Sequence, residues 1–335
     1  MPKTMNASVL LEPGSVAYQT TNAPVPRTGQ VLIRVKRAGI CGTDLTIYAG
    51  RHPRAKAPLV MGHEIVGIVE DTGPAGPGRL KAGDAVTVNP LLWCGACRSC
   101  VSGNAHVCET LRLLGIDADG GFAEYLVANE DRVHRLDPAV PWDEAALCEP
   151  IAVAIHAIRS SRFRAGDDVI VVGAGIIGAM TGYLLLHGGA QRVTITDVNA
   201  WRLEQAVKLG MTAAQPAELG RDTTQASVVF ECSGHPSAFD NLTQLAVNSG
   251  QIVFVGVPPV PVSVMVRDLV FRELNTVAVR VYRNEEFAMA AHLVSQRKVN
   301  LAPFVSTVLP LDRLAEGIEL ARAGQGWKVV MDPGA

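Results

Sequence analysis

Four cysteines lie close together in one stretch of the chain. Cys94, Cys97 and Cys100 are separated by two residues each, and Cys108 follows, so that all four fall within fifteen residues. Four thiolates on one loop can surround a tetrahedral zinc ion. Sulfur then fills every coordination position and none is left for a substrate. We therefore expect a structural zinc here and not a catalytic one.

The other interpretations of these cysteines are free thiols in a loop or a zinc ribbon that binds nucleic acid, and composition weighs against the ribbon. The chain has 30 Lys+Arg and 32 Asp+Glu, a formal charge of −2, so it has no cationic excess with which to neutralise phosphates. Hydrophobic residues make up 48% and charged residues 19%, which is typical of a compact globular protein. With 335 residues and roughly 150 residues per domain, about two domains are expected.

A glycine motif indicates a dinucleotide site. In VIVVGAGIIG, Gly173, Gly175 and Gly178 follow a β-branched run and precede a helical one, as in a turn that lets a pyrophosphate approach a helix N-terminus. Asp197 ends the next expected strand, 19 residues beyond Gly178, where a carboxylate accepts hydrogen bonds from an adenosine ribose. It favours NAD over NADP, although Arg192 and Arg202 lie nearby. The alternative is a glycine turn that binds no nucleotide.

Cys41 in AGICGTD and His63 in MGHE would each, taken alone, be read as ordinary core residues. With the four loop cysteines and the glycine motif downstream, however, the whole chain resembles the zinc-containing medium-chain alcohol and polyol dehydrogenases, and in particular their sorbitol and threonine dehydrogenase branch. The resemblance implies a GroES-like, mostly antiparallel β catalytic domain and a Rossmann domain with a doubly wound parallel sheet. It also implies two zinc ions per chain, one catalytic and one structural, and NAD.

The resemblance assigns the catalytic zinc ligands. Cys41 and His63 match two of them, and Glu149 in ALCEPIAVAIHAI matches the third position, where the sorbitol dehydrogenase branch carries glutamate followed by proline. A shift of one residue in register would put Cys148 there instead. Glu64 matches a position beside the metal and either binds zinc directly or lies behind it.

Two further residues have roles implied by the family. Asp44 is expected to hold the imidazole of His63 in its ligating orientation. Thr43 matches the hydroxyl that takes the proton of the alcohol as hydride leaves for nicotinamide C4. Beyond Thr43 the route of the proton to solvent is not assigned, because several relatives place a histidine where this chain has Thr46. His52 is a candidate for this step on proximity in sequence alone.

The metal should dominate this chemistry. Zinc in a protein can lower the pKa of bound water from about 15.7 to about 7, which corresponds to roughly 12 kcal/mol. A positioned general base contributes roughly 3 to 5 kcal/mol. On the cofactor side, the residues expected to contact the dinucleotide are Gly173, Gly175, Ile177, Gly178, Asp197, Arg202 and Val257.

The substrate is less sharply indicated. Glu149 and Tyr282, the latter loosely aligned with a substrate-side tyrosine of sorbitol dehydrogenase, favour a secondary alcohol of a polyol, sugar or cyclitol. The segment TDVNAWRLEQA instead resembles bacterial threonine dehydrogenases and suggests an amino alcohol such as L-threonine. A third reading is a non-catalytic dinucleotide-binding relative with structural zinc only. Arg280 and Arg283 either bind an acidic substrate group or are solvated surface.

The elements that must position these residues follow from periodicity. Short alternating apolar runs from residue 30 to about 135 predict antiparallel sheet. From 169 to about 280, strands such as VIVV and RVTIT alternate with helical segments, which predicts a parallel sheet. Residues 169–186 are uncharged and long enough to be tested as a membrane span, but glycines interrupt them, so a strand, turn and helix explain them better. Two helices, the second capped by Asp312 and closed by Gly324, and a strand at WKVVMD complete the chain.

These patterns predict a catalytic domain from residues 1–150 and 283–335, and an NAD-binding domain from residues 151–282. The N-terminus lacks the body of a secretory signal, so we expect a cytoplasmic protein with a small-molecule substrate and neither a nucleic-acid nor a membrane partner. Relatives form dimers or tetramers, often through edge strands of their cofactor domains. A homo-oligomer is therefore expected, with QIVFVGVPPVPVSVMV as the candidate edge.

Overall fold

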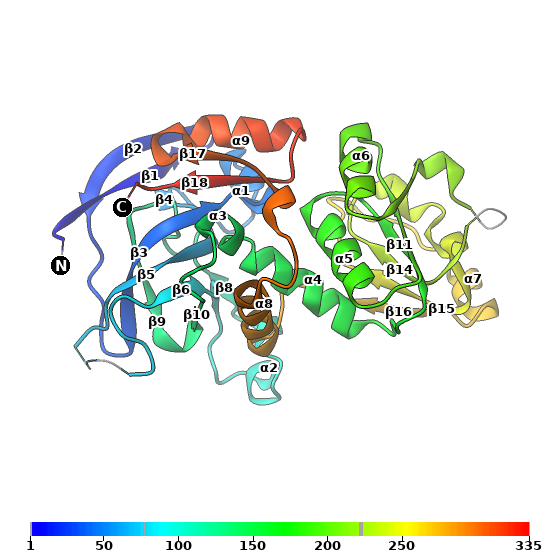
Figure 1. The fold of residues 1–335 in the computed structure, drawn as a ribbon, viewed down its shortest axis with the longest axis horizontal. Helices are drawn as coiled ribbons and strands as arrows, with labels where there is room; N and C mark the ends of the chain where they lie inside the picture. The colour runs from blue at the N-terminus through cyan, green and yellow to red at the C-terminus, as the bar shows by residue number, and fades with distance from the viewer. Residues whose placement is uncertain (1, 75, 77, 221–223, 335) are drawn as a thin grey trace. The chain divides into compact units, whose positions relative to one another are not determined.

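The structure is a computed structural model that describes residues 2–334 except 75, 77 and 221–223, and it divides into two compact units. The β-rich unit comprises Met1–Glu149 and Arg283–Ala335, and the parallel-sheet unit comprises Pro150–Tyr282 (Figure 1). Helix α4 (Cys148–Ser160) runs across the boundary between them.

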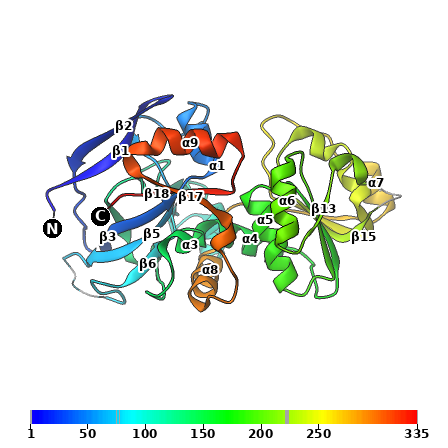
Figure 2. The same cartoon turned by 45° about the horizontal axis from the view of Figure 1, so that its top comes forward.

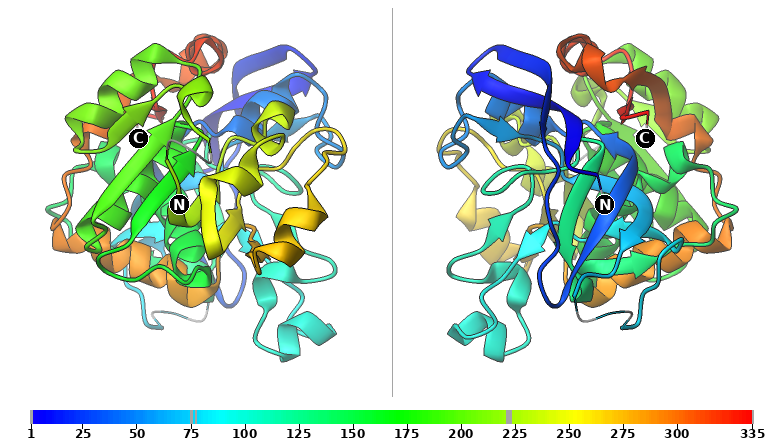
Figure 3. Two further views of the ribbon diagram at one scale, coloured as in Figure 1. Left: turned by 90° about the vertical axis from the view of Figure 1, so that its right-hand side faces the viewer. Right: turned by 90° about the vertical axis from the view of Figure 1, so that its left-hand side faces the viewer.

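The β-rich unit is built on sheets that are mostly antiparallel, as the alternating runs predict. The strands of the main sheet are, in spatial order, β10 (Val133–Arg135), β6 (Ala85–Val88), β5 (Glu64–Asp71), β3 (Gln30–Gly39), β18 (Lys328–Asp332) and β17 (Val305–Pro310), with β9 (Tyr125–Asn129) also on β3. The smaller sheets are β2 (Ser15–Asn22), β1 (Thr4–Glu12) and β4 (Leu59–Val60), and the pair β7 (Leu91–Leu92) and β8 (Arg112–Leu113). The β1–β2 hairpin is seen in blue in Figure 3.

Short helices connect these strands. They are α1 (Gly42–Tyr48), α2 (Arg98–Val101), η1 (Ala105–Val107), η2 (Glu130–Arg132), α3 (Trp142–Ala145), α8 (Asn284–Gln296), η6 (Ala302–Phe304), η7 (Leu311–Arg313) and α9 (Leu314–Ala323). The predicted cap at Asp312 is wrong, because Asp312 lies within η7 and Arg313 is the N-cap residue of α9. The predicted end at Gly324 is confirmed: its φ of 68° is the left-handed conformation that glycine adopts readily.

The C-terminal strand lies in the middle of the main sheet. In β18, Val330 and Met331 pair with Gly39 and Ala38 of β3, and β17 pairs in parallel with β18 on its other side. Figure 1 shows the red β18 beside the blue β3. The pairing places the last strand of the chain in the same sheet that presents two candidate ligands. Cys41 follows β3 in this sheet, and His63 precedes β5.

The second unit is a parallel sheet with helices, as predicted. Its strands are, in spatial order, β13 (Thr212–Ala214), β12 (Arg192–Thr196), β11 (Asp168–Val172), β14 (Ala226–Glu231), β15 (Ala246–Phe254) and β16 (Asn275–Ala278). All neighbouring pairs are parallel. The connections include α5 (Ile176–His187), α6 (Ala200–Lys208), α7 (Val266–Phe271), η3 (Pro216–Glu218), η4 (Pro236–Phe239) and η5 (Leu242–Leu245).

The core of this unit explains its long apolar runs. Ile170, Val229 and Ile252, from three adjacent strands, are each at most 1% exposed and belong to one cluster. Strands covered on both faces contain continuous β-branched residues and do not alternate. Figure 2 shows α5 and α6 lying along this sheet.

The strand order corrects one expectation. The segment beginning at Gln251 does not form the edge of the sheet, because β15 pairs with β14 on one side and with β16 on the other. The edge on this side of the sheet is β16, which the sequence pattern did not single out; the opposite edge is β13. No helix of the described residues is long and apolar enough to cross a membrane, and residues 169–186 form β11, the glycine turn and most of α5.

Candidate functional site

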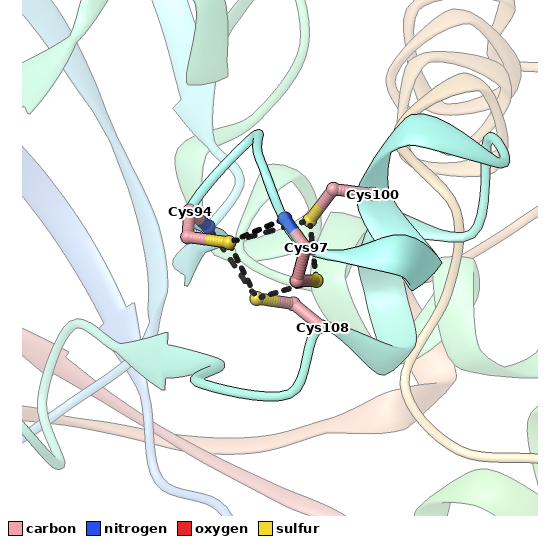
Figure 4. A group of neighbouring side chains, drawn as sticks. All are labelled: Cys94, Cys97, Cys100 and Cys108. Carbon is pink, nitrogen blue, oxygen red and sulfur yellow. Dashed lines mark hydrogen bonds between the residues drawn. The ribbon is translucent and has the colours of Figure 1, made fainter.

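The four loop cysteines converge on one point (Figure 4). Their Sγ–Sγ distances are 3.5 Å for Cys97–Cys100, 3.6 Å for Cys108–Cys94, and 3.9 Å for both Cys94–Cys100 and Cys97–Cys108. A tetrahedron with Zn–S bonds of about 2.3 Å has edges of about 3.8 Å. The sulfurs therefore already have the spacing that a tetrahedral zinc ion requires.

Local backbone structure prepares this loop for thiolates. The backbone N–H groups of Ala96 and Cys97 donate to Cys94 Sγ at 3.4 and 3.3 Å, and Cys94 N donates to Cys108 Sγ at 3.4 Å. The hydrogen bonds from Ala96 and Cys97 lower the pKa of Cys94 to about 6. None of the cysteines forms a disulfide. The donor set and its hydrogen bonds fit a structural zinc ion.

A second group of metal-ligating side chains is formed by Cys41, His63 and Glu64. One ligand atom from each lies within 4.8 Å of those of the other two. Cys41 is the N-cap residue of α1, directly after β3, and the other two residues stand at the start of the adjacent strand β5. The pairing of β3 with β5 therefore brings together residues that are 22 positions apart.

Asp44 joins the two segments that present Cys41 and His63. It is fully buried, and its carboxylate accepts hydrogen bonds from Cys41 N at 2.8 Å and Gly62 N at 3.3 Å. Burial raises the pKa of Asp44. Its Oδ1 lies 3.8 Å from Nδ1 of His63, a buried atom that has no hydrogen-bond partner among the described residues. The carboxylate thus stands behind the imidazole, where it can fix the orientation of the ring.

The electrostatics of this group favour a cation. Burial on its own lowers the pKa of His63, but the negative charges of Cys41, Asp44 and Glu149 outweigh burial and hold that pKa well above its ordinary value. These negatively charged groups stabilise a proton on the imidazole. They would likewise stabilise a divalent ion bound to the neutral imidazole. The donor set of sulfur, imidazole and carboxylate suits zinc.

Glu64 already has a partner in the protein. Lys328 Nζ lies 2.5 Å from Glu64 Oε1 and 2.6 Å from Oε2, and it also donates to the carbonyl of Ile40 at 3.0 Å. Both side chains of the ion pair are 1% exposed. Burial on its own lowers the pKa of Lys328, but the Glu64 charge outweighs it and raises that pKa. The sequence left open whether Glu64 binds zinc directly or lies behind the metal. In the structure its carboxylate is bound to Lys328.

Glu149 lies near this group but outside its compact set of ligand atoms. It is the second residue of α4 and is 7% exposed. Its charge raises the pKa values of both His63 and Lys328, which places it in their electrostatic surroundings. The neighbouring Cys148 is completely buried, and burial raises the pKa of its thiol to about 12. The charge of Glu149 acts on His63, whereas the thiol of Cys148 interacts with Thr87, which favours Glu149 over Cys148.

The candidate relay groups differ in their placement. Thr43 Oγ1 lies 3.8 Å from Cys41 Sγ, whereas the hydroxyl of Thr46 donates to the carbonyl of Gly42 at 3.1 Å. His52 accepts hydrogen bonds at Nδ1 from Arg54 N and Ala55 N, so its Nε2 carries the proton of the neutral ring. Burial and Arg54 lower the pKa of His52. Of these groups, Thr43 is the one in contact with an expected ligand.

In the parallel-sheet unit, the glycine motif adopts the geometry of a phosphate-binding turn. Gly173 has a φ of 99°, a conformation that other residues rarely adopt. Gly178 lies at the start of α5, and a Cβ there would collide with the carbonyl of Gly173. Gly175 is the N-cap residue of α5, with nothing near its missing side chain, so the helix N-terminus is accessible to an anion.

Next to this turn is a cavity of about 380 Å³. Its lining includes Gly173, Gly175, Asp197 and Arg202. The carboxylate of Asp197 accepts hydrogen bonds from Ala174 N at 2.7 Å and from Asn199 N at 2.8 Å, and Arg202 Nη1 lies 3.7 Å from its Oδ2. The carboxylate is thereby fixed at the rim of the cavity, with a cation beside it.

Five other residues that the sequence singled out are placed less directly. Ile177 is half-buried in the first turn of α5, and Val257 is 83% exposed in the segment after β15, close to Gly234. Tyr282 is completely buried. Arg280 is exposed, and Arg283 is the N-cap residue of α8.

Sequence reasoning missed Lys328 and Arg132, which are both buried cations. A signal existed for Lys328, since it stands at the start of the apolar strand WKVVMD, but its partner is 264 positions away. Arg132 gave no signal in the sequence, because its surroundings are formed by a loop that precedes it by some forty residues.

Comparisons with known proteins agree with this fold. The model for the alcohol dehydrogenase GroES-like domain matches residues 27–138, and the model for zinc-binding dehydrogenases matches residues 177–296. The chain is 34% identical over 299 residues to a 2-dehydro-3-deoxy-L-galactonate 5-dehydrogenase from Pseudoalteromonas atlantica, covering 87% of each. It is 34% identical over 330 residues to an L-threonine 3-dehydrogenase from Bacillus velezensis, covering 92% of this chain and 94% of the relative.

Solved structures give the same result. A zinc-binding dehydrogenase from Sinorhizobium meliloti 1021, bound to NADP, has a TM-score of 0.94 at 29% identity and covers 99% of this chain and 100% of that one. An alcohol dehydrogenase from E. coli CFT073, complexed with NADH, has a TM-score of 0.92 at 27% identity, with 99% and 100% covered. The chain belongs to the zinc-containing medium-chain dehydrogenases, a family of oxidoreductases. The fold and family predictions are confirmed.

Proposed function

We propose that this protein oxidises a secondary alcohol, that of a polyol, sugar or sugar acid, with NAD as the hydride acceptor. The observation that carries the proposal is the buried group of Cys41, His63 and Glu64, with Asp44 behind the imidazole and Glu149 in its surroundings. Similarity to a 2-dehydro-3-deoxy-L-galactonate 5-dehydrogenase supports a sugar-derived substrate.

Cys41, His63 and Glu149 would hold the catalytic zinc, and Glu64 stays with Lys328 in the resting protein. Bound there, zinc supplies the acidity that an alcohol hydroxyl lacks. Asp44 keeps the His63 ring from turning. Thr43 Oγ1, a hydroxyl close to Cys41 Sγ, accepts the substrate's proton while its own proton passes on toward solvent. The tetrathiolate group of Cys94, Cys97, Cys100 and Cys108 would hold the structural zinc.

The dinucleotide would bind in the parallel-sheet unit. The N-terminus of α5 meets the pyrophosphate, and Asp197 accepts hydrogen bonds from the adenosine ribose. We favour NAD because a 2′-phosphate would meet the Asp197 carboxylate. Arg202, held beside Asp197, is the one feature that favours NADP, and one solved relative contains that cofactor.

The partner of this chain would be a second copy of itself. Met265, Val266, Val270 and Phe271, in and next to α7, are between 59% and 78% exposed. In the described residues β16 pairs with β15 alone, so its other edge is open. Exposed apolar residues and an open strand edge favour association of two parallel-sheet units. Gel filtration with light scattering should give a dimer or tetramer, and Phe271→Glu should shift it toward a monomer.

One experiment tests the enzymatic proposal. Zinc content by atomic absorption is measured together with reduction of NAD and NADP at 340 nm across polyols, aldonic acids and L-threonine. We expect two zinc ions per chain and turnover with NAD on a polyol or sugar acid. Turnover on L-threonine alone would replace the proposal by an amino-alcohol dehydrogenase, which the threonine dehydrogenase relative makes the second candidate. One zinc per chain and no turnover would indicate a dinucleotide-binding protein.

A further inference from the structure

A buried arginine lies against the zinc-binding loop with part of its guanidinium unpaired. Arg132 ends η2 and is 6% exposed. Its carbonyl accepts a hydrogen bond from Asn89 N at 2.8 Å, which ties it to the strand that leads toward the loop. Within the described part of the chain, its Nε and Nη1 atoms have no hydrogen-bond partner. The carboxylate of Asp131 lies 3.6 Å from Nη1, but that side chain is 67% exposed to water.

The groups that face Arg132 come from the cysteine loop. Its guanidinium carbon lies 2.8 Å from the ring centroid of Trp93, the residue immediately before Cys94. Burial lowers the pKa of Arg132 to about 10, and the charges of Asp131 and Cys100 act in the opposite direction, so the side chain stays cationic at neutral pH. The cation therefore lies against the aromatic face at the start of the loop, close enough to Cys100 to respond to its charge.

A buried cation with unsatisfied donors is unfavourable unless an opposite charge lies near it. The loop offers such a charge when it holds metal, because four thiolates around a divalent ion carry a net charge of −2. A tetrathiolate site with that net charge is in turn stabilised by a nearby cation that does not compete for the metal, and a guanidinium cannot lose its proton to become a ligand at neutral pH.

We propose that Arg132 is the counter-charge of the tetrathiolate zinc site and, with Trp93, fastens the loop of residues 94–108 to the main sheet of the β-rich unit. Arg132 is thus a positioning residue for the structural metal. The proposal rests on the structural zinc proposed above. It predicts that Arg132 and zinc stabilise the protein together, and that each is less favourable without the other.

The first test measures loss of structural zinc. All variants carry Cys41→Ser, so that the zinc held by the four cysteines is followed alone, and its transfer to excess chelator is timed. We expect about tenfold faster loss in Arg132→Met, the scale on which residues behind metal ligands act. Arg132→Lys, which keeps the charge, should lose zinc at a rate between those of the parent and Arg132→Met. Arg135→Met is the matched control, because Arg135 is 56% exposed and paired with Asp84.

The second test separates charge compensation from simple packing. In the zinc-bound protein, Arg132→Met should lower the melting temperature. In a Cys94→Ser/Cys97→Ser variant, which lacks the metal, the same substitution should leave the melting temperature unchanged or raise it, because it removes a buried cation that has lost its counter-charge. A residue that only fills space would destabilise both backgrounds alike.

The outcomes distinguish the two proposals. A parent that holds no zinc at all would remove the structural zinc and this inference with it. A parent with one zinc, but with Arg132→Met losing it at the parental rate, or with equal destabilisation in both backgrounds, would overturn the role of Arg132 alone. If Arg132→Met does not fold, Arg132→Lys decides. Zinc loss less than tenfold faster than in the Arg135→Met control supports the need for charge, and loss tenfold faster or more contradicts it.

Discussion

Lys328 Nζ lies 2.5 Å from Glu64 Oε1, and both side chains are 1% exposed. The two residues stand on strands that flank β3, one from each end of the chain. Gly39 of β3 allows this arrangement, because a Cβ at that position would collide with the Glu64 carboxylate. The C-terminal strand therefore contributes a charge directly to the candidate metal group. It holds Glu64 in place beside Cys41 and His63.

Removing one partner of this pair should destabilise the protein strongly. Lys328→Met leaves the Glu64 carboxylate buried without its cation, and the free energy of unfolding should fall by about 3 to 5 kcal/mol. Urea unfolding followed by circular dichroism measures the change. Adding Glu64→Gln to Lys328→Met should recover part of the loss, because it removes the uncompensated charge.

A matched control is the exposed pair of Arg313 and Glu316, whose side chains are 50% and 45% exposed. Glu316→Gln should cost no more than about 1 kcal/mol. A loss in Lys328→Met as small as that of the control would mean that the Glu64 carboxylate is solvated in solution or already bound to a cation other than Lys328.

Asp44 should set the affinity of the candidate catalytic site without binding metal itself. Asp44→Asn retains the shape of the side chain but removes the charge that faces His63 Nδ1 at 3.8 Å. We expect zinc affinity at this site to fall roughly 10- to 100-fold. Competition with a chromophoric chelator measures it, and the zinc held by the four loop cysteines should be unaffected. Unchanged affinity in a folded Asp44→Asn protein would exclude the positioning role.

The sequence predicted local features well and the distant partners of its residues poorly. The four cysteines, the glycine turn and the strand–helix alternation each depend on neighbours within about twenty residues, and spacing or periodicity reveals them. The ion pair of Lys328 with Glu64 depends on two strands meeting on β3, which no local pattern encodes. The edge strand was misplaced for the same reason: β15 and β16 both have β-strand patterns, and only the order of the sheet decides which one is outermost.

Asp197 should determine which nicotinamide cofactor is used. Replacing it by glycine removes the carboxylate that lies 2.7 Å from Ala174 N at the rim of the cavity, while Arg202 stays nearby. For NAD, we expect KM to rise by about tenfold, equivalent to about 1.4 kcal/mol of lost binding. For NADP, kcat/KM should rise, because the negative charge that repels a 2′-phosphate is gone. Steady-state kinetics with both cofactors measures these changes, and Asp168→Asn on the same sheet is the control. An unaltered ratio of kcat/KM for NAD to kcat/KM for NADP would remove Asp197 from the ribose site.

His134 should make the stability of the β-rich unit depend on pH. Burial and Arg79 lower the pKa of His134 to about 4, and its ring packs against Phe287 with centroids 5.2 Å apart. In the unfolded chain the pKa is about 6.5. Between these values the unfolded state binds a proton that the folded state does not, so stability is present above pH 6.5 and is lost as the pH falls toward 4.

The expected loss between pH 7.5 and pH 5 is about 1 kcal/mol for this histidine, since the ring is not completely shielded from water. The measurement is the free energy of unfolding in urea at both pH values for the parent and for His134→Gln, which cannot titrate. Protonation of zinc ligands destabilises both proteins equally and cancels in the comparison. The parent should lose about 1 kcal/mol more than His134→Gln, and parallel losses in the two proteins would show that the histidine is protonated equally in the folded and unfolded states.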